Sequence, residues 1–256
     1  MSGGEQTAPP GATQDAPGMF RCFVGLPLPP EWQDRLAALR DELSVSGHAS
    51  GDVRDPALTD LLRRLRWTPP GNWHLTLRFL GGVPASRCGE VADALKAIPF
   101  APVSLAVGGA GVFPARGAPR VLWLGLARGA RECAALAGAV DAALVPLGFA
   151  PDDRPFAPHL TLARLREAHR PDRRENDRQR NDHQRHERRG GESPSPPFPR
   201  AAWEARDALL AAVDARVSRS ASPWPGCTVR DMVLWRSDLG GAHPVYTPLA
   251  VLPART

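Results

Sequence analysis

The tetrapeptide His-Leu-Thr-Leu occurs twice in this chain, beginning at His74 and again at His159. From the chain's own composition, a second copy would arise by chance with a probability on the order of a few in a thousand, which points to an internal repeat. In a β-strand, residues two apart point to the same face. Each copy therefore places an imidazole and a hydroxyl together, His74 with Thr76 and His159 with Thr161, and its two leucines on the other face. We expect two similar strands that present these four groups to one cleft.

The rest of the chain alternates between strand-like and helix-like segments. Short apolar runs bounded by Gly and Pro predict strands, and apolar residues three and four positions apart predict helices. The expected strands are 20–26, 73–80, 103–107, 120–126, 159–165, 228–235 and 245–252. The expected helices are 31–43, 58–65, 90–98, 133–147 and 201–217. This order indicates an α+β fold with two similar lobes, each of which contributes one motif strand.

Two segments differ in composition from the rest. Residues 1–18 are rich in Pro, Gly and Ala and lack the charged and apolar regions of a secretory signal, so we expect a disordered leader. Residues 168–200 are dense in charged and amide side chains and nearly devoid of apolar ones, which predicts a disordered insert. The remainder, 19–256, is expected to form a single domain interrupted by that insert. The other histidines are placed in loops or in the insert: His48, His243, His169, His183 and His186.

The bulk composition limits the classes of function. The net charge is +5 and Lys96 is the single lysine, so the cations are nearly all arginine. Arginine suits a nucleic-acid or nucleotide partner, although a GC-rich coding sequence accounts for most of the excess. The four cysteines are widely spaced, which favours reduced thiols in a cytoplasmic protein and no zinc site. No apolar run is long enough for a membrane span and no phosphate-binding loop for ATP occurs. We therefore expect no zinc site and no use of ATP, and we further expect a monomer without a cofactor.

Paired His-x-Thr strands favour chemistry on a phosphoester. The pKa of an unperturbed histidine lies near 6.5, so one imidazole of a pair can be neutral while the other is protonated, as concerted general base and general acid catalysis requires. The hydroxyls of Thr76 and Thr161, with a nearby arginine, would stabilise charge on the phosphate oxygens. Arg78 continues the alternation of His74 and Thr76, whereas Arg164 falls on the other face by strict alternation. The sequence thus predicts Arg78 as the phosphate-binding cation.

These residues carry a family resemblance. His-Leu-Thr-Leu-Arg-Phe-Leu-Gly from His74 and His-Leu-Thr-Leu-Ala-Arg from His159 resemble the motifs of the two-histidine phosphoesterases. Within that superfamily the chain is most similar to the RNA 2',3'-cyclic phosphodiesterases, also called 2'-5' RNA ligases (LigT-like). Further matching stretches begin at Phe20, Pro119, Leu147 and Val233, and the resemblance covers 20–165 and 201–252. It implies a bilobal fold, with antiparallel sheets around a central cleft, and metal-independent opening of a terminal 2',3'-cyclic phosphate on RNA to a 2'-phosphate.

The resemblance also implies roles for individual residues. It makes His74 the proton donor to the leaving 3'-oxygen and His159 the acceptor of a proton from water, a division that the symmetry of the motifs leaves open. Thr76 and Thr161 would hold the phosphate oxygens, and Phe23 is the match for an aromatic residue that stacks on the terminal base. The reverse reaction would join RNA ends through a 2'-5' linkage. Two alternatives remain: a cyclic phosphodiesterase for small nucleotides, such as an ADP-ribose cyclic phosphate, and a non-catalytic module that binds RNA ends.

Overall fold

The computed structural model describes residues 18–49, 56–152, 155–165, 200–219, 224–241 and 243–255. The leader expected over residues 1–18 therefore lies outside it except for Gly18, and the insert expected over 168–200 lies outside it except for Arg200. The strands are β1 (Met19–Pro27), β2 (Leu65–Trp67), β3 (His74–Pro84), β4 (Val103–Phe113), β5 (Val121–Arg128), β6 (Leu160–Leu165), β7 (Cys227–Val229), β8 (Asp231–Asp238) and β9 (Val245–Pro253). The helices are α1 (Pro30–Ala49), α2 (Pro56–Arg64), α3 (Cys88–Lys96), α4 (Ala130–Leu144) and α6 (Arg200–Arg219), with short 3-10 turns η1 (Ala85–Arg87) and η2 (Val145–Leu147).

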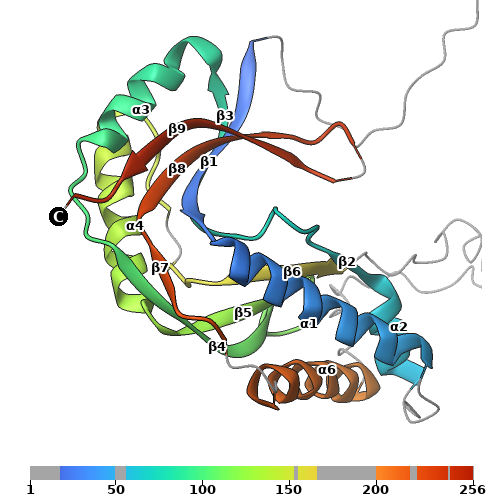
Figure 1. Cartoon of the computed structure of the whole chain (residues 1–256). Helices are drawn as coiled ribbons and strands as arrows, with labels where there is room; N and C mark the ends of the chain where they lie inside the picture. The colour runs from blue at the N-terminus through green and yellow to red at the C-terminus, as the bar shows by residue number, and fades with distance from the viewer. Residues whose placement is uncertain are drawn as a thin grey trace, which may run out of the picture.

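The strands form one curled antiparallel sheet in the order β7-β4-β5-β6-β3-β1-β8-β9, with β2 paired to β6 (Figure 1). The two motif strands, β3 and β6, are neighbours at its centre, and their register places Leu75 opposite Leu160. Two four-stranded halves meet there. We call β3-β1-β8-β9 the first lobe and β6-β5-β4-β7 the second lobe. The predicted α+β bilobal fold is confirmed.

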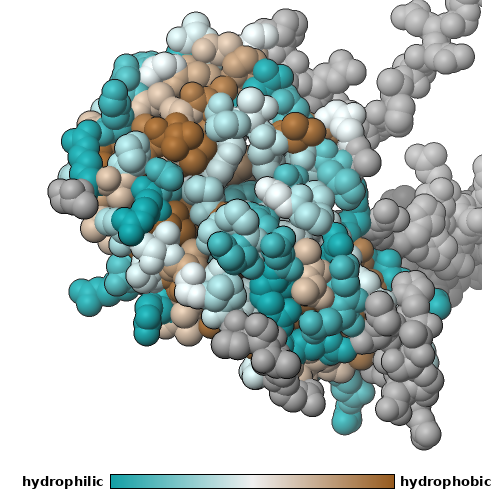
Figure 2. Space-filling view, in the orientation of Figure 1, coloured by the Kyte–Doolittle hydropathy of each residue, from teal (hydrophilic) through white to brown (hydrophobic). Residues whose placement is uncertain are grey.

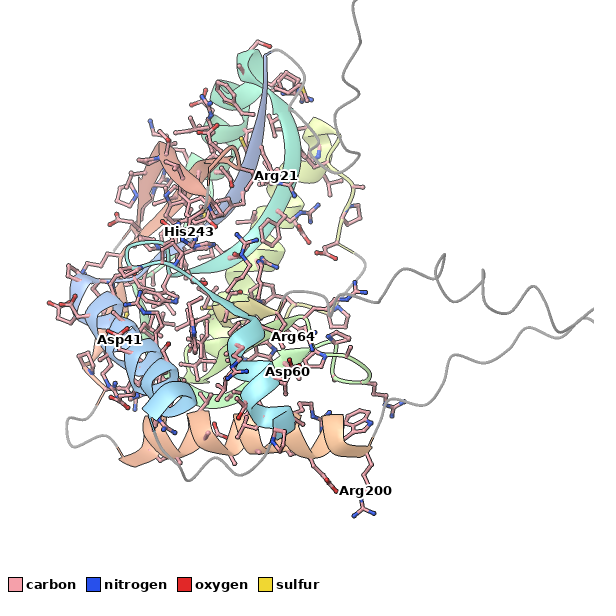
Figure 3. The ribbon with its side chains drawn as sticks, turned by 90° about the vertical axis from the view of Figure 1, so that its right-hand side faces the viewer. Arg21, Asp41, Asp60, Arg64, Arg200 and His243 are labelled. Atoms are coloured by element: carbon pink, nitrogen blue, oxygen red, sulfur yellow. The ribbon has the colours of Figure 1, made fainter. Side chains whose placement is uncertain are left out.

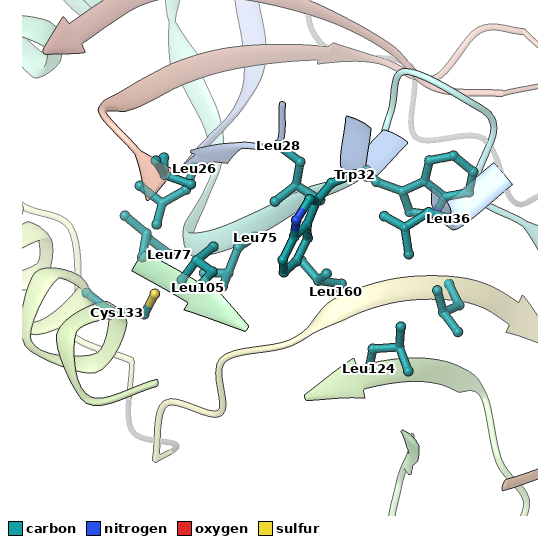
Figure 4. Packing of buried hydrophobic residues seen from close by; sticks show 14 of the residues in the cluster. Leu26, Leu28, Trp32, Leu36, Leu75, Leu77, Leu105, Leu124, Cys133 and Leu160 are labelled. Atoms are coloured by element: carbon teal, nitrogen blue, oxygen red, sulfur yellow. The ribbon is translucent and has the colours of Figure 1, made fainter. Parts of the chain in front are cut away.

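Helices cross from one lobe to the other. Helix α1 follows β1 of the first lobe, but it packs with α2 and α6 beside the second lobe (Figure 1). Helix α4 follows β5 of the second lobe, but it packs on β3 of the first. The predicted apolar stripe of α1 is buried, with Trp32 and Leu36 at 0% exposure. In Figure 4 these side chains lie against Leu160 of the second motif. Each lobe thus packs against a helix that follows a strand of the other lobe.

The motif leucines lie in the core, as strand alternation predicts. Leu75 and Leu160 have 0% exposure, and Leu77 and Leu162 have 5% and 1%. Figure 4 shows Leu75 and Leu77 beside Leu105 and Cys133, which come from β4 and α4. The histidine and threonine of each motif consequently belong to the opposite face of the sheet, which we call the motif face.

The structure corrects several predicted boundaries. Helix α1 continues to Ala49, so that His48 lies in a helix rather than a loop, whereas His243 lies in the loop between β8 and β9 as expected. Strand β3 runs through its glycine pair to Pro84, because the neighbouring β1 continues to pair with it. Strand β2 was not predicted, since its three residues are too few to show a period.

The surface seen in Figure 2 is mixed, with hydrophobic residues gathered over β9, where Val251 is 57% exposed. Among the residues that the structure describes, no helix is long and apolar enough to span a membrane.

Candidate active site

The four motif groups meet where the lobes join. Because β3 and β6 run antiparallel with Leu75 opposite Leu160, His74 lies across from Thr161 and Thr76 across from His159. Side chains directly opposite on such a pair have Cβ atoms roughly 4.5–5.5 Å apart. All four are partly exposed, and neither threonine hydroxyl has a hydrogen-bond partner among the described residues. The predicted grouping of two imidazoles and two hydroxyls on one face is what the structure contains.

Each motif strand carries a β-bulge at its fourth motif residue. In the pairing of β1 with β3, Gly25 opposes Thr76 and Val24 opposes Arg78, so Leu77 is the extra residue. In the pairing of β5 with β6, Trp123 opposes Thr161 and Leu122 opposes Ala163, so Leu162 is the extra residue. An extra residue reverses the alternation of all side chains that follow it. The side chains after Leu77, as far as a second extra residue at Leu80, and those after Leu162 therefore face the opposite way from what strict alternation predicts.

The prediction that Arg78 binds phosphate is wrong in this fold, because the bulge turns its side chain to the helix-covered face. Arg78 is 8% exposed. Its guanidinium forms an ion pair with Asp141 of α4 and donates a second hydrogen bond to the carbonyl of Ala150. A buried arginine with these partners fastens α4 to β3 and is not available to a substrate on the motif face.

Arg164 takes the position that was expected of Arg78. The bulge at Leu162 returns Arg164 to the motif face, where it is exposed and lies opposite Arg66 of β2. Its charge lowers the pKa of both motif histidines and opposes the raised pKa of Tyr246. No described residue forms an ion pair with Arg164. Sequence reasoning missed it because period-two alternation does not register an inserted residue.

The two motif histidines share one tautomer. His74 Nδ1 lies 2.8 Å from the carbonyl oxygen of Asn72, and His159 Nδ1 lies 2.7 Å from that of Ala157. A carbonyl oxygen only accepts, so each Nδ1 carries the proton and donates it to the residue two positions earlier. Each Nε2 is therefore left with its lone pair when the ring is neutral. The amide of Asn72 donates in turn to the carbonyl of Pro244, which ties the first motif to the β8–β9 hairpin.

The surroundings of both histidines favour the neutral ring in the free protein. Burial lowers the pKa of His74 to about 4, with further lowering by His159 and Arg164, while the bond to Asn72 opposes the shift. Burial also lowers the pKa of His159, and Arg164 adds to this, while the bond to Ala157 opposes it. The expectation of one protonated and one neutral ring thus requires a further negative charge at the site. A bound phosphodiester has that charge.

Aromatic rings surround His74. Phe23 lies 4.7 Å from it between ring centroids, Tyr246 5.2 Å in an edge-on arrangement, and Trp235 5.6 Å. Phe23 is 3% exposed and also contacts Trp235 and Tyr246, so a base has no free face of this ring on which to stack. The structure therefore speaks against Phe23 as the stacking residue. Its ring instead packs against His74 and contributes to the burial that lowers the pKa of that histidine.

A second aromatic group flanks His159. The ring of Phe113 lies edge-on at 5.0 Å and that of Trp123 at 6.1 Å between centroids. A Cβ at Gly111, which pairs with Trp123, would lie 2.1 Å from the indole, so only glycine leaves room for this ring. Sequence reasoning did not single out Tyr246, Trp235, Phe113 or Trp123, because strand pairing that is distant in sequence brings them to the motifs.

The described residues contain no group of three His, Cys, Asp or Glu side chains placed to hold a metal ion. The polar groups gathered on the motif face are two imidazoles, two hydroxyls and a guanidinium. Such a set can bind an anion of phosphate size and move protons on either side of it.

Comparisons with known proteins identify one family. The family model described as LigT like Phosphoesterase matches residues 26–123 and 124–188. The RNA 2',3'-cyclic phosphodiesterase of Aeropyrum pernix is 34% identical over 134 residues, which are 52% of this chain and 68% of that protein. The protein of the same name from Geobacillus stearothermophilus is 36% identical over 154 residues, which are 58% of this chain but only 43% of that protein.

Solved structures share the fold. E. coli LigT complexed with 3'-AMP aligns with a TM-score of 0.57 and 22% identity, covering 93% of this chain and 99% of LigT. TT0787 of Thermus thermophilus aligns with a TM-score of 0.57 and 24% identity, covering 92% of this chain and 98% of that one. With the family model matching more than half of the sequence, the expected membership is confirmed: this chain belongs to the LigT-like phosphoesterases.

Proposed function

We propose that the protein hydrolyses the terminal 2',3'-cyclic phosphate of RNA to a 2'-phosphomonoester. The observation that carries the proposal is that the two His-x-Thr motifs lie on neighbouring antiparallel strands, β3 and β6, with the charge of Arg164 beside them. The relatives named RNA 2',3'-cyclic phosphodiesterase support the same reaction. The phosphodiester would sit between His74 and His159, with one of its free oxygens near each threonine hydroxyl.

The proposed reaction needs two coordinated proton transfers. Nε2 of neutral His159 accepts a proton from water as the water oxygen forms a bond to phosphorus. The bond from phosphorus to the 3'-oxygen breaks, and protonated His74 donates its Nε2 proton to that oxygen. The products are a 2'-phosphate and a 3'-hydroxyl, and the two histidines exchange protonation states. This division of roles is taken from the family resemblance, and either ring has the tautomer to serve as base.

Arg164 and the threonines would hold the charge that develops. Attack of water adds negative charge to the free phosphate oxygens, and donors already fixed around them stabilise it at no cost of reorganisation. The negative phosphodiester also raises the pKa of the ring beside it, which would protonate the acid in the complex. Run backwards, the same steps would form a 2'-5' linkage, with hydrolysis favoured in water.

The test is turnover of an oligonucleotide that ends in a 2',3'-cyclic phosphate. His74→Ala and His159→Ala are each expected to lower kcat by about 10²–10⁴-fold, because each removes one proton transfer. Product identity, 2'- against 3'-phosphate, is read by phosphorus NMR, and folding by circular dichroism. Wild-type turnover is expected to survive a chelator. A folded variant that retains full activity would overturn the mechanism, and binding without turnover by the wild type would favour an RNA-end binding module.

A substrate with sulfur in place of the 3'-oxygen separates the two roles. A thiolate leaves without protonation, so the variant that lacks the general acid should regain most of its rate and the variant that lacks the base should not. We expect rescue of His74→Ala alone. Rescue of His159→Ala alone would reverse the assignment of acid and base while leaving the reaction itself intact.

A further inference from the structure

Phe79 is an exposed aromatic residue on the motif face. The bulge at Leu77 moves it there, opposite Phe23 of β1, and 62% of it is exposed. Although its ring contacts Phe23 at the edge of the aromatic cluster, most of its surface is open to solvent. Nucleic-acid bases stack on exposed aromatic rings, and this stacking depends little on the identity of the base.

The ring of Phe79 lies outside the group of aromatic rings that contact His74. Phe23 lies 4.7 Å from His74 and Phe79 lies 6.1 Å from Phe23, both between ring centroids, and Phe79 is five residues after His74 along β3. Phe79 therefore belongs to the outward path from the reacting group and is not in the ring cluster that touches His74. A terminal nucleoside held against that cluster would leave Phe79 open to the next base along the strand.

Arg21 continues the same path. On β1 the motif face carries Gly25 beside Thr76, then Phe23 beside Phe79, then Arg21 beside Gly82. At about 3.3 Å per residue, Arg21 is roughly 13 Å along the strand from the position of Thr76. Arg21 is exposed and pairs with no described acidic residue. Figure 3 shows it on the first lobe, above Arg64 of α2, on the side where the lobes part.

The second lobe has a different residue at the matching place. Phe79 and Arg164 both stand five positions after their motif histidine and both follow the bulge. One is an uncharged ring and the other a cation, so the first lobe offers stacking where the second offers charge. The path from Phe79 to Arg21 is thus specific to the first lobe.

We propose that Phe79 and Arg21 bind the RNA strand upstream of the cyclic phosphate, Phe79 by stacking on the base before the terminal one and Arg21 by contacting an upstream phosphate. The inference rests on the proposed function and narrows its substrate to an oligonucleotide rather than a mononucleotide or a small nucleotide. A strand with alternating bases and phosphates matches a ring followed by a cation along one face.

Steady-state kinetics on a nucleoside 2',3'-cyclic phosphate and on a trinucleotide with the same end test the proposal. Phe79→Ala should lower kcat/KM for the trinucleotide roughly 5- to 150-fold, the range of one lost base stack, and leave the mononucleotide unchanged. Phe79→Trp should restore the rate. Arg21→Gln should reduce the slope of log kcat/KM against log salt by about 0.7 for the trinucleotide only, and Arg21→Lys should keep it.

Matched changes elsewhere serve as controls. Arg131→Gln removes the same charge from α4, on the opposite face of the sheet, and Val145→Ala removes an exposed apolar side chain from η2. Both should leave the two substrates unaffected. Equal losses on both substrates, no loss on either, or a change in oligomeric state with Phe79→Ala would each overturn the inference while the proposed function stands. A wild type that turns over neither substrate would overturn the proposed function itself.

Discussion

At the scale of single residues, the surroundings of the motif histidines favour the neutral ring, whereas the proposed reaction needs one of them protonated. Each Nδ1 donates to a carbonyl oxygen and the pKa of each ring is lowered, so the free site favours the neutral form of both rings. Catalysis needs one ring of each kind. The anionic substrate would complete the site by favouring the protonated form of one ring, which links binding to protonation.

This linkage predicts a pH dependence. The kcat/KM profile reports the free enzyme, and both pKa values there are lowered, so its maximum is expected on the acid side of pH 6.5. The kcat profile reports the complex, where the phosphate raises the pKa, so its maximum should lie at higher pH. Rates measured across the range from about pH 4 to about pH 9 decide this. Coincident profiles would show that the phosphate does not supply the charge.

Arg164→Gln provides a check on the same residues. Removing this cation withdraws one cause of the lowered histidine pKa, so the alkaline limb of kcat/KM should move to higher pH as the maximal rate falls. Arg78→Gln would instead lower stability, since it leaves Asp141 without its partner on β3. An unchanged limb with Arg164→Gln would contradict the influence assigned to its charge.

At the scale of elements, strand alternation predicted the correct face for the motif side chains that precede each bulge and the wrong face for those that follow it. The period of two correctly placed His74, Thr76 and their counterparts on one face, because no bulge lies within the first three motif residues. It failed at Arg78 and Arg164, since an inserted residue depends on the partner strand and leaves no local signal in the sequence. The aromatic neighbours were beyond prediction for a related reason, because they come from strands far away in the chain.

Gly25 offers a test of how closely the strands must approach at the bulge. A Cβ there would lie 2.5 Å from the backbone oxygen of Leu75, so Gly25→Ala must push β1 from β3 beside Thr76. We expect a loss of about 1–3 kcal/mol of stability and a lower kcat, because the motif groups move apart. The measurements are denaturant unfolding and steady-state kinetics.

Gly89→Ala is the matched control for this change. Gly89 lies in α3, and a Cβ there meets nothing within 4 Å. Alanine favours a helix, so stability should stay level or rise by up to about 1 kcal/mol with kcat unchanged. If Gly25→Ala behaved like Gly89→Ala, the close approach of the strands would not be needed to place the motifs.

At the scale of the whole molecule, the crossed helices make each lobe depend on the other. Helix α1 leaves the first lobe to pack beside the second, and α4 leaves the second to pack on β3, where Arg78 holds Asp141. The order of the predicted helices and strands indicated two lobes but not this exchange of helices. The period of an apolar helix face shows that the face is buried, but it does not show which element covers it. We therefore expect the two lobes to form a single domain, as predicted from the sequence.

Unfolding should therefore occur in one transition. Val24→Ala in β1 and Leu124→Ala in β5 remove fully buried side chains from different lobes, at 0% exposure each. We expect Leu124→Ala to lower the free energy of unfolding by about 2–5 kcal/mol and Val24→Ala to lower it by less, because it removes fewer atoms. Both variants should shift the same single unfolding transition. Far-ultraviolet circular dichroism and tryptophan fluorescence are expected to coincide in both variants. Two separate transitions would show that the lobes fold independently.

The paired bulges have a consequence for strand polarity. A quartet of two histidines and two threonines related by a near two-fold rotation looks the same to an RNA strand that enters in either direction. An RNA strand has distinct 5' and 3' ends, and only one orientation presents the cyclic phosphate with its chain trailing correctly. The residue two positions after each bulge breaks this symmetry, because it is Phe79 on β3 and Arg164 on β6. We expect this difference to set the direction in which an RNA strand binds.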